Sequence, residues 1–455
     1  MLPRKIEHWV PAIAALLGSA LGSHAQTPAP AQVTRPTAPL SPAPATSPVA
    51  PAGSKRSPLA DAPQWKLLEA FSGVISREEF DAAFASVYSD GADPPPQWKL
   101  EPGKIIIETA PGQSPVEVAF RDPAAAEKNV PRFWHAPREL PPLKPGAPPL
   151  TGVHIALDPG HIGGGYAKVE ERWLSMTPDT AIAEGSLVLQ VAQLIKPRLE
   201  ALGARVSLVR SAEAPVTSAK PGDFNAAARE ILKEADITNP KENYTGAEGD
   251  AKVATVQWQA EKLFYLVSEI HARAKKVNEE LRPDLVVCLH LNAEPWGDPA
   301  NPVFVEKNHF HLLINGCYSR EELELEDVRF DMFRRLFARI HDEERRMADV
   351  VAAAMADATG LPPYVYPGKN ARGVPPGPYV FARNLLANRT YQCPVIYLEP
   401  YVMNHEQIYK RLLLGHYIGR ALLEGKLLTS PLEDYARGVV QGLVDYYKRE
   451  RRIAP

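Results

Sequence analysis

The chain has 455 residues, a formal net charge of −3 and only three cysteines. This length suits one large domain with a smaller one, and the near-neutral charge gives no reason to expect a nucleic-acid partner. A disulfide-stabilised scaffold is also excluded, because it would need several bridges. Free buried thiols are favoured over a single bridge for Cys288, Cys317 and Cys393.

Residues 1–25 have the features of a secretory signal peptide: a basic start, a short apolar stretch and a small-x-small cleavage site at Ser23-His24-Ala25. The apolar stretch is too short to span a bilayer. An uncleaved membrane anchor is the alternative. We therefore expect an exported protein without a transmembrane segment in its mature form, located in the periplasm, the cell envelope or the extracellular space.

The sequence alternates between proline-rich and ordered segments before the main domain. Residues 26–58 are rich in Pro and Ala and predict an extended linker, and residues 122–150 predict a second proline-rich connector. Between them, residues 59–121 predict a small α+β unit. Its expected parts are a helix at 64–71, a second helix with a capping box at Ser76, and strands on either side of Pro111-Gly112.

Residues 151–455 predict an α/β domain with a mainly parallel central sheet flanked by helices, because strand and helix patterns alternate. The expected strands are Val153–Leu157, Arg205–Val209, Leu285–Leu289, His309–Asn315 and Val395–Leu398. The expected helices are Glu184–Leu202, Gln257–Leu281, Glu343–Thr359, His405–Leu428 and Glu433–Arg451, with the last two forming the C-terminal helical region 405–451.

Two segments of this domain are expected at the surface. Residues 211–256 are polar, contain several prolines and glycines, and are too long for a simple connection in a compact domain. They predict an insertion that overhangs or caps a site. The segment Arg334 to Asp349 is charged and predicts a solvated helix.

The stretch VHIALDPGHIGGG, Val153 to Gly165, contains the first candidate site residue. A buried strand ends here in a Pro-Gly turn that is followed by His161 and three glycines. Open α/β folds bind ligands at the carboxyl ends of their strands, and imidazole is the commonest metal ligand. Taken alone, however, His161 is better explained as a structural histidine.

Three further residues can join His161. His290 follows the strand Leu285–Leu289, Glu399 ends the last strand, and Glu184 begins a helix. Each also has a simpler explanation: a carboxylate is favoured in the first turn of a helix, and Glu399 precedes a turn-forming Pro400. Two histidines, one carboxylate and an open fourth position form a catalytic zinc site, which lowers the pKa of bound water to about 7. A carboxylate beside such water is the expected general base.

Other candidates stay open. Glu170 and Glu171 are rival ligands by their closeness to His161, although they lie within a loop. His309 and His311 alternate along a strand and are expected to be structural, with a ligand role if an assigned ligand is wrong.

The order of these motifs resembles the zinc-dependent N-acetylmuramoyl-L-alanine amidases with an amidase-3-type catalytic domain. The resemblance covers residues 151–427 and rests on LDPGHIGG, Glu184 at a helix start, LEALG and VSLVR, the pair Arg273 and Asn278, HLN at His290, and PVIYLEP followed by Asn404. Each motif alone is weak evidence, and their shared order is strong. The chain departs from the family pattern at Ile162, which stands where a glycine is usual, and in its enlarged segments.

The resemblance implies that His161, Glu184 and His290 hold Zn²⁺ and that Glu399 is the catalytic acid and base. The substrate would be peptidoglycan, cleaved between N-acetylmuramic acid and the L-alanine of the stem peptide. Asn292, Arg383 and Asn404 are expected to contact the substrate, and a protein activator is a further expected partner. Ile162 is expected to crowd the metal edge. The alternatives are a zinc peptidase or deacylase acting on another amide, and a non-catalytic wall-binding or activator protein.

Overall fold

The structure is a computed structural model that describes residues 55–91, 96–177, 180–246, 250–295, 297 and 302–454. The expected signal peptide and most of the expected first linker lie outside these residues. Within the described residues, no helix is both long enough and apolar enough to cross a membrane. The three cysteines are buried and free, as predicted.

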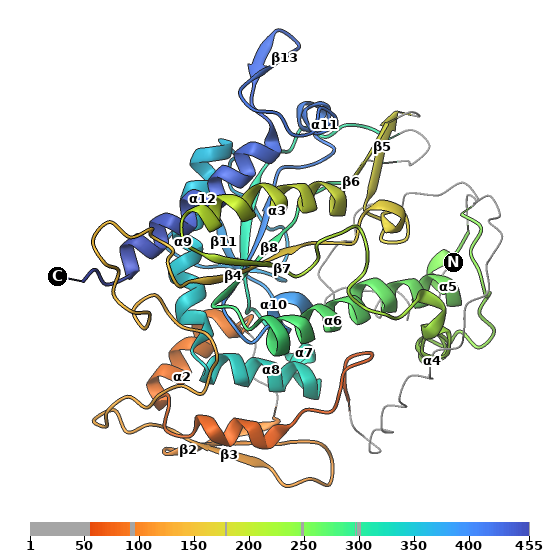
Figure 1. Ribbon diagram of the computed structural model, residues 1–455. Coiled ribbons are helices and arrows are strands. Elements are labelled where there is room, and N and C mark those ends of the chain that lie inside the picture. The colour runs from red at the N-terminus through yellow and green to blue at the C-terminus, as the bar shows by residue number, and fades with distance from the viewer. Residues whose placement is uncertain are drawn as a thin grey trace, which may run out of the picture.

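A seven-stranded sheet in the order β10-β11-β9-β12-β8-β4-β7 forms the centre of the molecule (Figure 1). Four of the six neighbouring strand pairs are parallel: β11 with β9, β12 with β8, β8 with β4, and β4 with β7. The pairs β10 with β11 and β12 with β9 are antiparallel. This confirms the predicted α/β class with a mainly parallel sheet. The strands are β4 (His154–Pro159), β7 (Arg205–Leu208), β8 (Leu285–Leu289), β9 (Phe310–Ile314), β10 (Arg372–Gly373), β11 (Val380–Ala382) and β12 (Val395–Pro400).

Helices cover the sheet on both sides, which explains why β4 and β8 are buried along their whole length. On one side α3 (Glu184–Ala201), α12 (Pro431–Glu450) and α9 (Ile340–Thr359) pack side by side, with α12 in the middle. Two glycines of α12, Gly438 and Gly442, allow this close approach, because a Cβ there would overlap atoms of Met355 and Val351 on α9. On the other side lie α6 (Glu269–Lys275), α8 (Glu326–Phe337) and α10 (Leu386–Thr390) (Figure 1).

The helix predicted at residues 257–281 is present as one continuous element. It contains α5 (Val256–Lys262) and α6, each followed by a π-helical segment, Leu263–Ser268 and Lys276–Leu281. The predicted insertion packs along this helix through α4 (Asn225–Glu234). The backbone N–H groups at positions 216 and 217 both donate to the Glu269 carboxylate.

The N-terminal unit combines a helical pair with a small antiparallel sheet. A 3₁₀ helix (Trp65–Phe71) precedes α2 (Arg77–Ala83), whose predicted capping box at Ser76 is present. The sheet consists of β1 (Trp98–Leu100), β2 (Lys104–Ile107) and β3 (Val116–Ala119). Aromatic side chains of this unit pack on α8, so its apolar core is continuous with that of the main domain.

Two sequence-based predictions in the main domain are wrong. The helix expected at 405–428 ends early: α11 (Glu406–Leu413) is followed by a hairpin of β13 (Ala421–Leu423) and β14 (Lys426–Leu428). Glycines with positive φ at 415, 419 and 425 break the helix. The charged segment 334–349 is not a single solvated helix. It spans the end of α8 and the start of α9, and it buries Arg335 and Glu344 completely.

Candidate metal centre

The strand register brings three candidate residues to one edge of the sheet. Leu289 of β8 lies opposite Pro159 of β4 and Leu398 of β12. His290 and Glu399 each follow one of these residues directly, and His161 follows two residues after Pro159. Since parallel strands present their carboxyl ends at the same edge, the three side chains meet there.

A short hairpin places the fourth residue. The strands β5 (Trp173–Thr177) and β6 (Thr180–Ala183) pair with each other, and β6 runs directly into α3, whose first residue is Glu184. The backbone N–H of Glu184 donates to the carbonyl of Arg172. Glu184 is therefore held at the helix start and is buried at 2% exposure.

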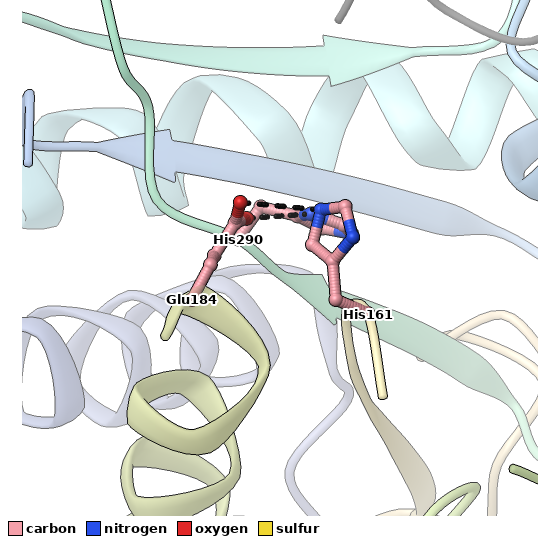
Figure 2. A group of neighbouring side chains, drawn as sticks. All are labelled: His161, Glu184 and His290. Carbon is pink, nitrogen blue, oxygen red and sulfur yellow. Dashed lines mark hydrogen bonds and ion pairs between the residues drawn. The ribbon is translucent and has the colours of Figure 1, made fainter. Parts of the chain in front are cut away.

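His161, Glu184 and His290 converge (Figure 2). Nδ1 of His290 lies 3.0 Å from Oε1 of Glu184, and Nε2 of His161 lies 3.2 Å from Oε2 of the same carboxylate. One ligand atom from each residue lies within 4.8 Å of the other two. A tetrahedral zinc ion with bonds of about 2.0–2.1 Å separates its ligand atoms by roughly 3.3 Å, so the donor set and its spacing fit zinc.

The charges of the trio are mutually dependent. Burial alone would raise the pKa of Glu184, but the two histidines hold it well below its ordinary value. Burial would likewise lower the pKa of His161, and the carboxylates of Glu184 and Glu170 together outweigh this effect and raise it. Burial lowers the pKa of His290, an effect that Glu184 only partly offsets. Without a cation, the pocket thus favours a proton on His161.

Glu170 supports His161 from behind. Its carboxylate lies 3.5 Å from Nδ1 of His161 and accepts the backbone N–H groups of Ile162 and Gly163. Such a contact leaves Nε2 as the ring nitrogen that faces Glu184. Glu170 is thus a neighbour of a candidate ligand. Glu171 points elsewhere and pairs with two lysines, Lys252 and Lys262.

Several further contacts fix the other members of the trio. The backbone N–H of Leu291 donates to Oε1 of Glu184, and the Arg172 side chain lies 3.5 Å from Oε2. The ring of Tyr397 stacks on His290 with the centroids 4.2 Å apart. Arg273 donates to Asp158 and to the carbonyl of His161, which holds the turn after β4. A single sequence offered no signal for Arg172 or Tyr397, because their roles depend on long-range packing.

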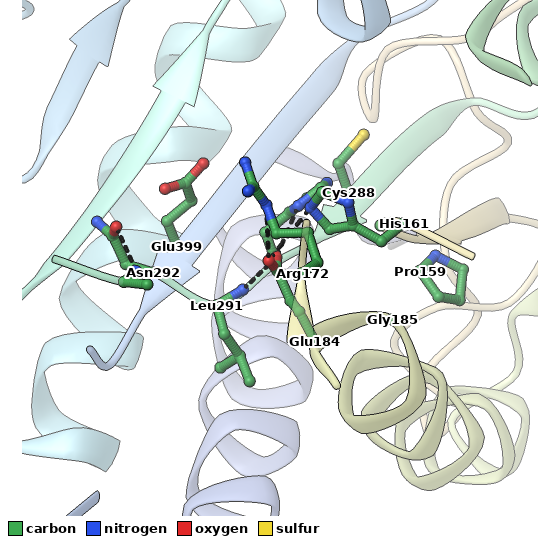
Figure 3. A network of polar contacts seen from close by, with 12 residues as sticks. Pro159, His161, Arg172, Glu184, Gly185, Cys288, Leu291, Asn292 and Glu399 are labelled. Carbon is green, nitrogen blue, oxygen red and sulfur yellow. Dashed lines mark hydrogen bonds and ion pairs between the residues drawn. The ribbon is translucent and has the colours of Figure 1, made fainter. Parts of the chain in front are cut away.

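Glu399 lies beside the trio and outside it (Figure 3). Burial and the nearby negative charge of Glu184 raise its pKa to about 7. On the neighbouring strand β9, His311 lies directly opposite, with Nε2 3.5 Å from Oε2 of Glu399. His309 contacts Glu294 instead. Neither histidine belongs to the trio, but His311 lines the same cavity as Glu399.

An open cavity of about 700 Å³ surrounds the trio and Glu399. Asn292 and Arg383, both expected to contact substrate, line it, together with the aromatic rings of Tyr364 and Tyr366. Asn404 does not line it: its side chain is fully buried, and its amide forms two hydrogen bonds with the backbone of Glu294. The expected substrate contact for Asn404 is therefore not supported by its position.

The structure also corrects the expectations that Ile162 crowds the metal edge and that residues 211–256 cap the site. Ile162 is fully buried in an apolar cluster with Phe264 and Tyr265 and does not line the cavity, since its side chain packs against the long helix. None of the described residues of the 211–256 segment lines the cavity either. The insertion lies against the long helix and leaves the site open.

A glycine beside His290 offers a direct test of the metal centre. A Cβ at Gly160 would overlap the His290 ring, whereas a Cβ at Gly165 would meet no atom within 4 Å. We expect Gly160→Ala to lower zinc affinity by about 10- to 100-fold, the range observed when the support of a ligand is lost. Titration with zinc would measure the change, and Gly165→Ala is the matched control. Unchanged affinity in Gly160→Ala would contradict a role for His290 as a ligand.

The sequence matches no protein-family model, and no curated protein matches it. Among solved structures, the chain is similar to the N-acetylmuramyl-L-alanine amidase Ami1 from Mycobacterium smegmatis, at 16% identity and a TM-score of 0.34, covering 66% of this chain and 99% of that one. It is similar to the CwlD amidase from Clostridioides difficile, solved with the GerS lipoprotein, at 11% identity and a TM-score of 0.36, covering 66% and 100%.

A third similar structure is the catalytic domain of CwlV, an N-acetylmuramoyl-L-alanine amidase from Bacillus (Paenibacillus) polymyxa, at 14% identity and a TM-score of 0.33, covering 65% of this chain and 97% of that one. At these TM-scores a likeness does not establish a common fold.

Proposed function

We propose that this chain is a zinc-dependent peptidoglycan amidase that cleaves the bond between N-acetylmuramic acid and the L-alanine of the stem peptide. The observation that supports this best is the convergence of His161, Glu184, His290 and Glu399 in one open cavity. The resemblance to amidase-3-type domains assigns the roles of zinc ligand and of catalytic acid and base to the same four residues.

The residues divide into ligands and a proton carrier. His161, Glu184 and His290 would hold the zinc ion, which when bound supplies Lewis acidity for the amide carbonyl and for water. Glu399 would accept a proton from the attacking water and pass it to the nitrogen of the leaving amine as the carbon–nitrogen bond breaks. Burial raises the pKa of this carboxylate to about 7 in the metal-free site, and a pKa above the ordinary range suits a group that both accepts and donates a proton.

The substrate is a cell-wall polymer, so we also propose that the chain acts in the cell envelope, after export directed by residues 1–25. Arg383 and Asn292 are the candidates for contact with the stem peptide, because both line the cavity. A protein activator remains a proposal based on the family resemblance alone.

Digestion of purified peptidoglycan, followed by mass analysis of the products, tests the function. We expect glycan ends with a free lactyl group and released peptides with a free L-alanine amino group. Cleavage only within the peptides would instead identify the alternative, a zinc peptidase or deacylase. Zinc binding without any cleavage would identify a non-catalytic wall-binding protein.

Zinc uptake is expected to release protons. Because the pKa of His161 is raised in the metal-free site, more of this residue is protonated at pH 6 than at pH 8, and zinc must displace that proton. Apparent zinc affinity should therefore fall as the pH falls. Calorimetric titration in two buffers of different ionisation enthalpy measures the number of protons released. A zinc affinity that does not fall from pH 8 to pH 6 would contradict a titrating His161 ligand.

A further inference from the structure

The segment that follows α11 exposes an unusual number of large apolar side chains. Ile418 is 88% exposed, Leu422 71% and Leu427 60%, and Leu413 and Leu414 at the base of the segment are also exposed. Single exposed apolar residues are normal on a soluble protein, but a cluster of this kind marks an interaction site. We call residues 416–428 the apolar hairpin.

The apolar hairpin stands away from the body of the molecule (Figure 1). Its strands β13 and β14 pair only with each other, and Leu422 lies directly opposite Leu427, so both side chains share a face. The turn consists of Glu424 and Gly425, both with positive φ, as in the tight turns of hairpins. An isolated two-stranded hairpin is marginally stable in water, so burial of this face against a partner would stabilise it.

Side-chain contacts hold the base of the hairpin. The Tyr417 hydroxyl donates to the Leu428 carbonyl, and the Ser430 hydroxyl donates to the Gly415 carbonyl. His416 lies 3.1 Å from a carboxylate oxygen of Glu433 on α12. The apolar tip is therefore presented to solvent by a fixed base.

The charges around the tip favour an anionic partner. Arg420 and Lys426 are exposed, and neither forms an ion pair with another described residue. The one acidic residue of the hairpin, Glu424, is paired with Lys410 of α11. The tip thus combines aliphatic side chains with two cations and no unpaired acid.

We propose that the apolar hairpin binds the surface of an anionic lipid bilayer, with Ile418, Leu422 and Leu427 in the boundary between head groups and acyl chains. Arg420 and Lys426 would face the lipid phosphates. Apolar insertion combined with attraction between cations and anionic lipids is the usual basis of reversible binding at a membrane surface.

A second copy of the chain fits this surface less well. Each strand of the hairpin has only three residues, whereas a stable protein–protein interface buries about 1,200–2,000 Å². A bilayer needs no such area, because each inserted side chain and each cation contributes separately. The proposal does not depend on the amidase activity, and it requires no spanning helix.

Docking would also orient the catalytic cavity. The Tyr409 hydroxyl on α11 accepts the backbone N–H of Met176 on β5, and β6, the partner of β5, leads into Glu184. The hairpin is thus connected to the elements that place the metal centre. Binding through it would hold the cavity in a defined position relative to the membrane.

A fluorescent label at the tip tests the proposal in the full chain. The three native cysteines are buried, so Leu422→Cys provides one accessible thiol for an environment-sensitive dye. We expect its emission to shift to the blue with vesicles of phosphatidylcholine and phosphatidylglycerol, and not with phosphatidylcholine alone. The label at Leu67→Cys, a 52% exposed position in the N-terminal unit, should not respond.

Charge variants test the electrostatic part. In the labelled protein, Arg420→Gln and Lys426→Gln should each raise the concentration of anionic lipid needed for half of the shift by about fivefold. No shift with anionic vesicles would overturn the proposal. A blue shift without vesicles that grows with protein concentration, together with a dimer mass in sedimentation, would also overturn it, because the partner would then be a second copy.

Discussion

Glu399→Gln is expected to reduce peptidoglycan cleavage by about 10²- to 10⁴-fold, the range for loss of a general acid–base group, while zinc content stays near that of the unmodified protein. Zinc content should be kept because the ligand atoms of His161, Glu184 and His290 form a cluster that does not include Glu399. The Glu399 carboxylate lies beside this cluster. Glutamine keeps the size of the side chain and removes its ability to take up a proton.

His161→Ala is expected to lose both zinc and activity, because it removes one of three ligands. The exposed Glu213, next to the glycine-rich loop and outside the cavity, provides the control Glu213→Gln, which should keep both. Metal analysis and digestion assays on the three variants distinguish the roles. Loss of zinc in Glu399→Gln would make Glu399 a ligand, and normal cleavage by that variant would exclude it as the proton carrier.

The pH profile gives an independent measure of the same residue. A general base must be deprotonated, so the rate should fall as the pH falls through the pKa of Glu399. That pKa is about 7 without a metal ion, and a nearby dication moves it down, because positive charge favours the carboxylate. The acid limb should therefore lie below pH 7 in the zinc-loaded protein. It should be absent from the residual activity of Glu399→Gln.

The second large effect concerns stability. Arg335 and Glu344 form a fully buried ion pair between α8 and α9. The guanidinium also donates to the Tyr391 carbonyl, and the Glu344 carboxylate accepts the backbone N–H of Val395 on β12. Removal of one partner leaves a buried charge without its counter-charge. We expect Arg335→Met to lower the free energy of unfolding by about 3–5 kcal/mol.

The double variant Arg335→Met with Glu344→Leu should recover much of this loss, because two apolar side chains leave no uncompensated charge. Urea unfolding would compare the midpoints. The exposed pair of Arg229 and Glu242 supplies the control, and Arg229→Met should leave the midpoint unchanged. A small effect of Arg335→Met would show that water reaches the remaining carboxylate.

The polar ends of buried strands were predictable from the sequence because their pattern is local. An apolar run that stops at His161, His290 or Glu399 marks a strand and its end, and the parallel arrangement places these ends at one edge. The start of α3 at Glu184 was predictable for the same reason. Local pattern therefore proposed these four residues as candidates, and the structure showed that they meet at one cavity.

Residues whose roles depend on distant partners were not predictable. The charges of Arg335 and Glu344 indicated a solvated helix, yet each finds its partner across a helix boundary and is buried. Glu170 was a rival ligand by sequence distance, and the fold turns it toward the back of His161. Asn404 followed a site strand, and its amide is used by the backbone of Glu294.

The sequence by itself indicated the class of fold and the strand ends, since apolar periodicity and turn residues act over a few positions, and the resemblance in motif order selected His161, Glu184, His290 and Glu399 from the candidates. Only the tertiary structure decided which charges are buried, which carboxylate supports His161, and that residues after Leu413 form an exposed hairpin and not a helix. Each of these features depends on packing between residues far apart in the sequence. Burial and the nearest opposite charge determine the free-energy cost of placing a charged side chain inside the protein.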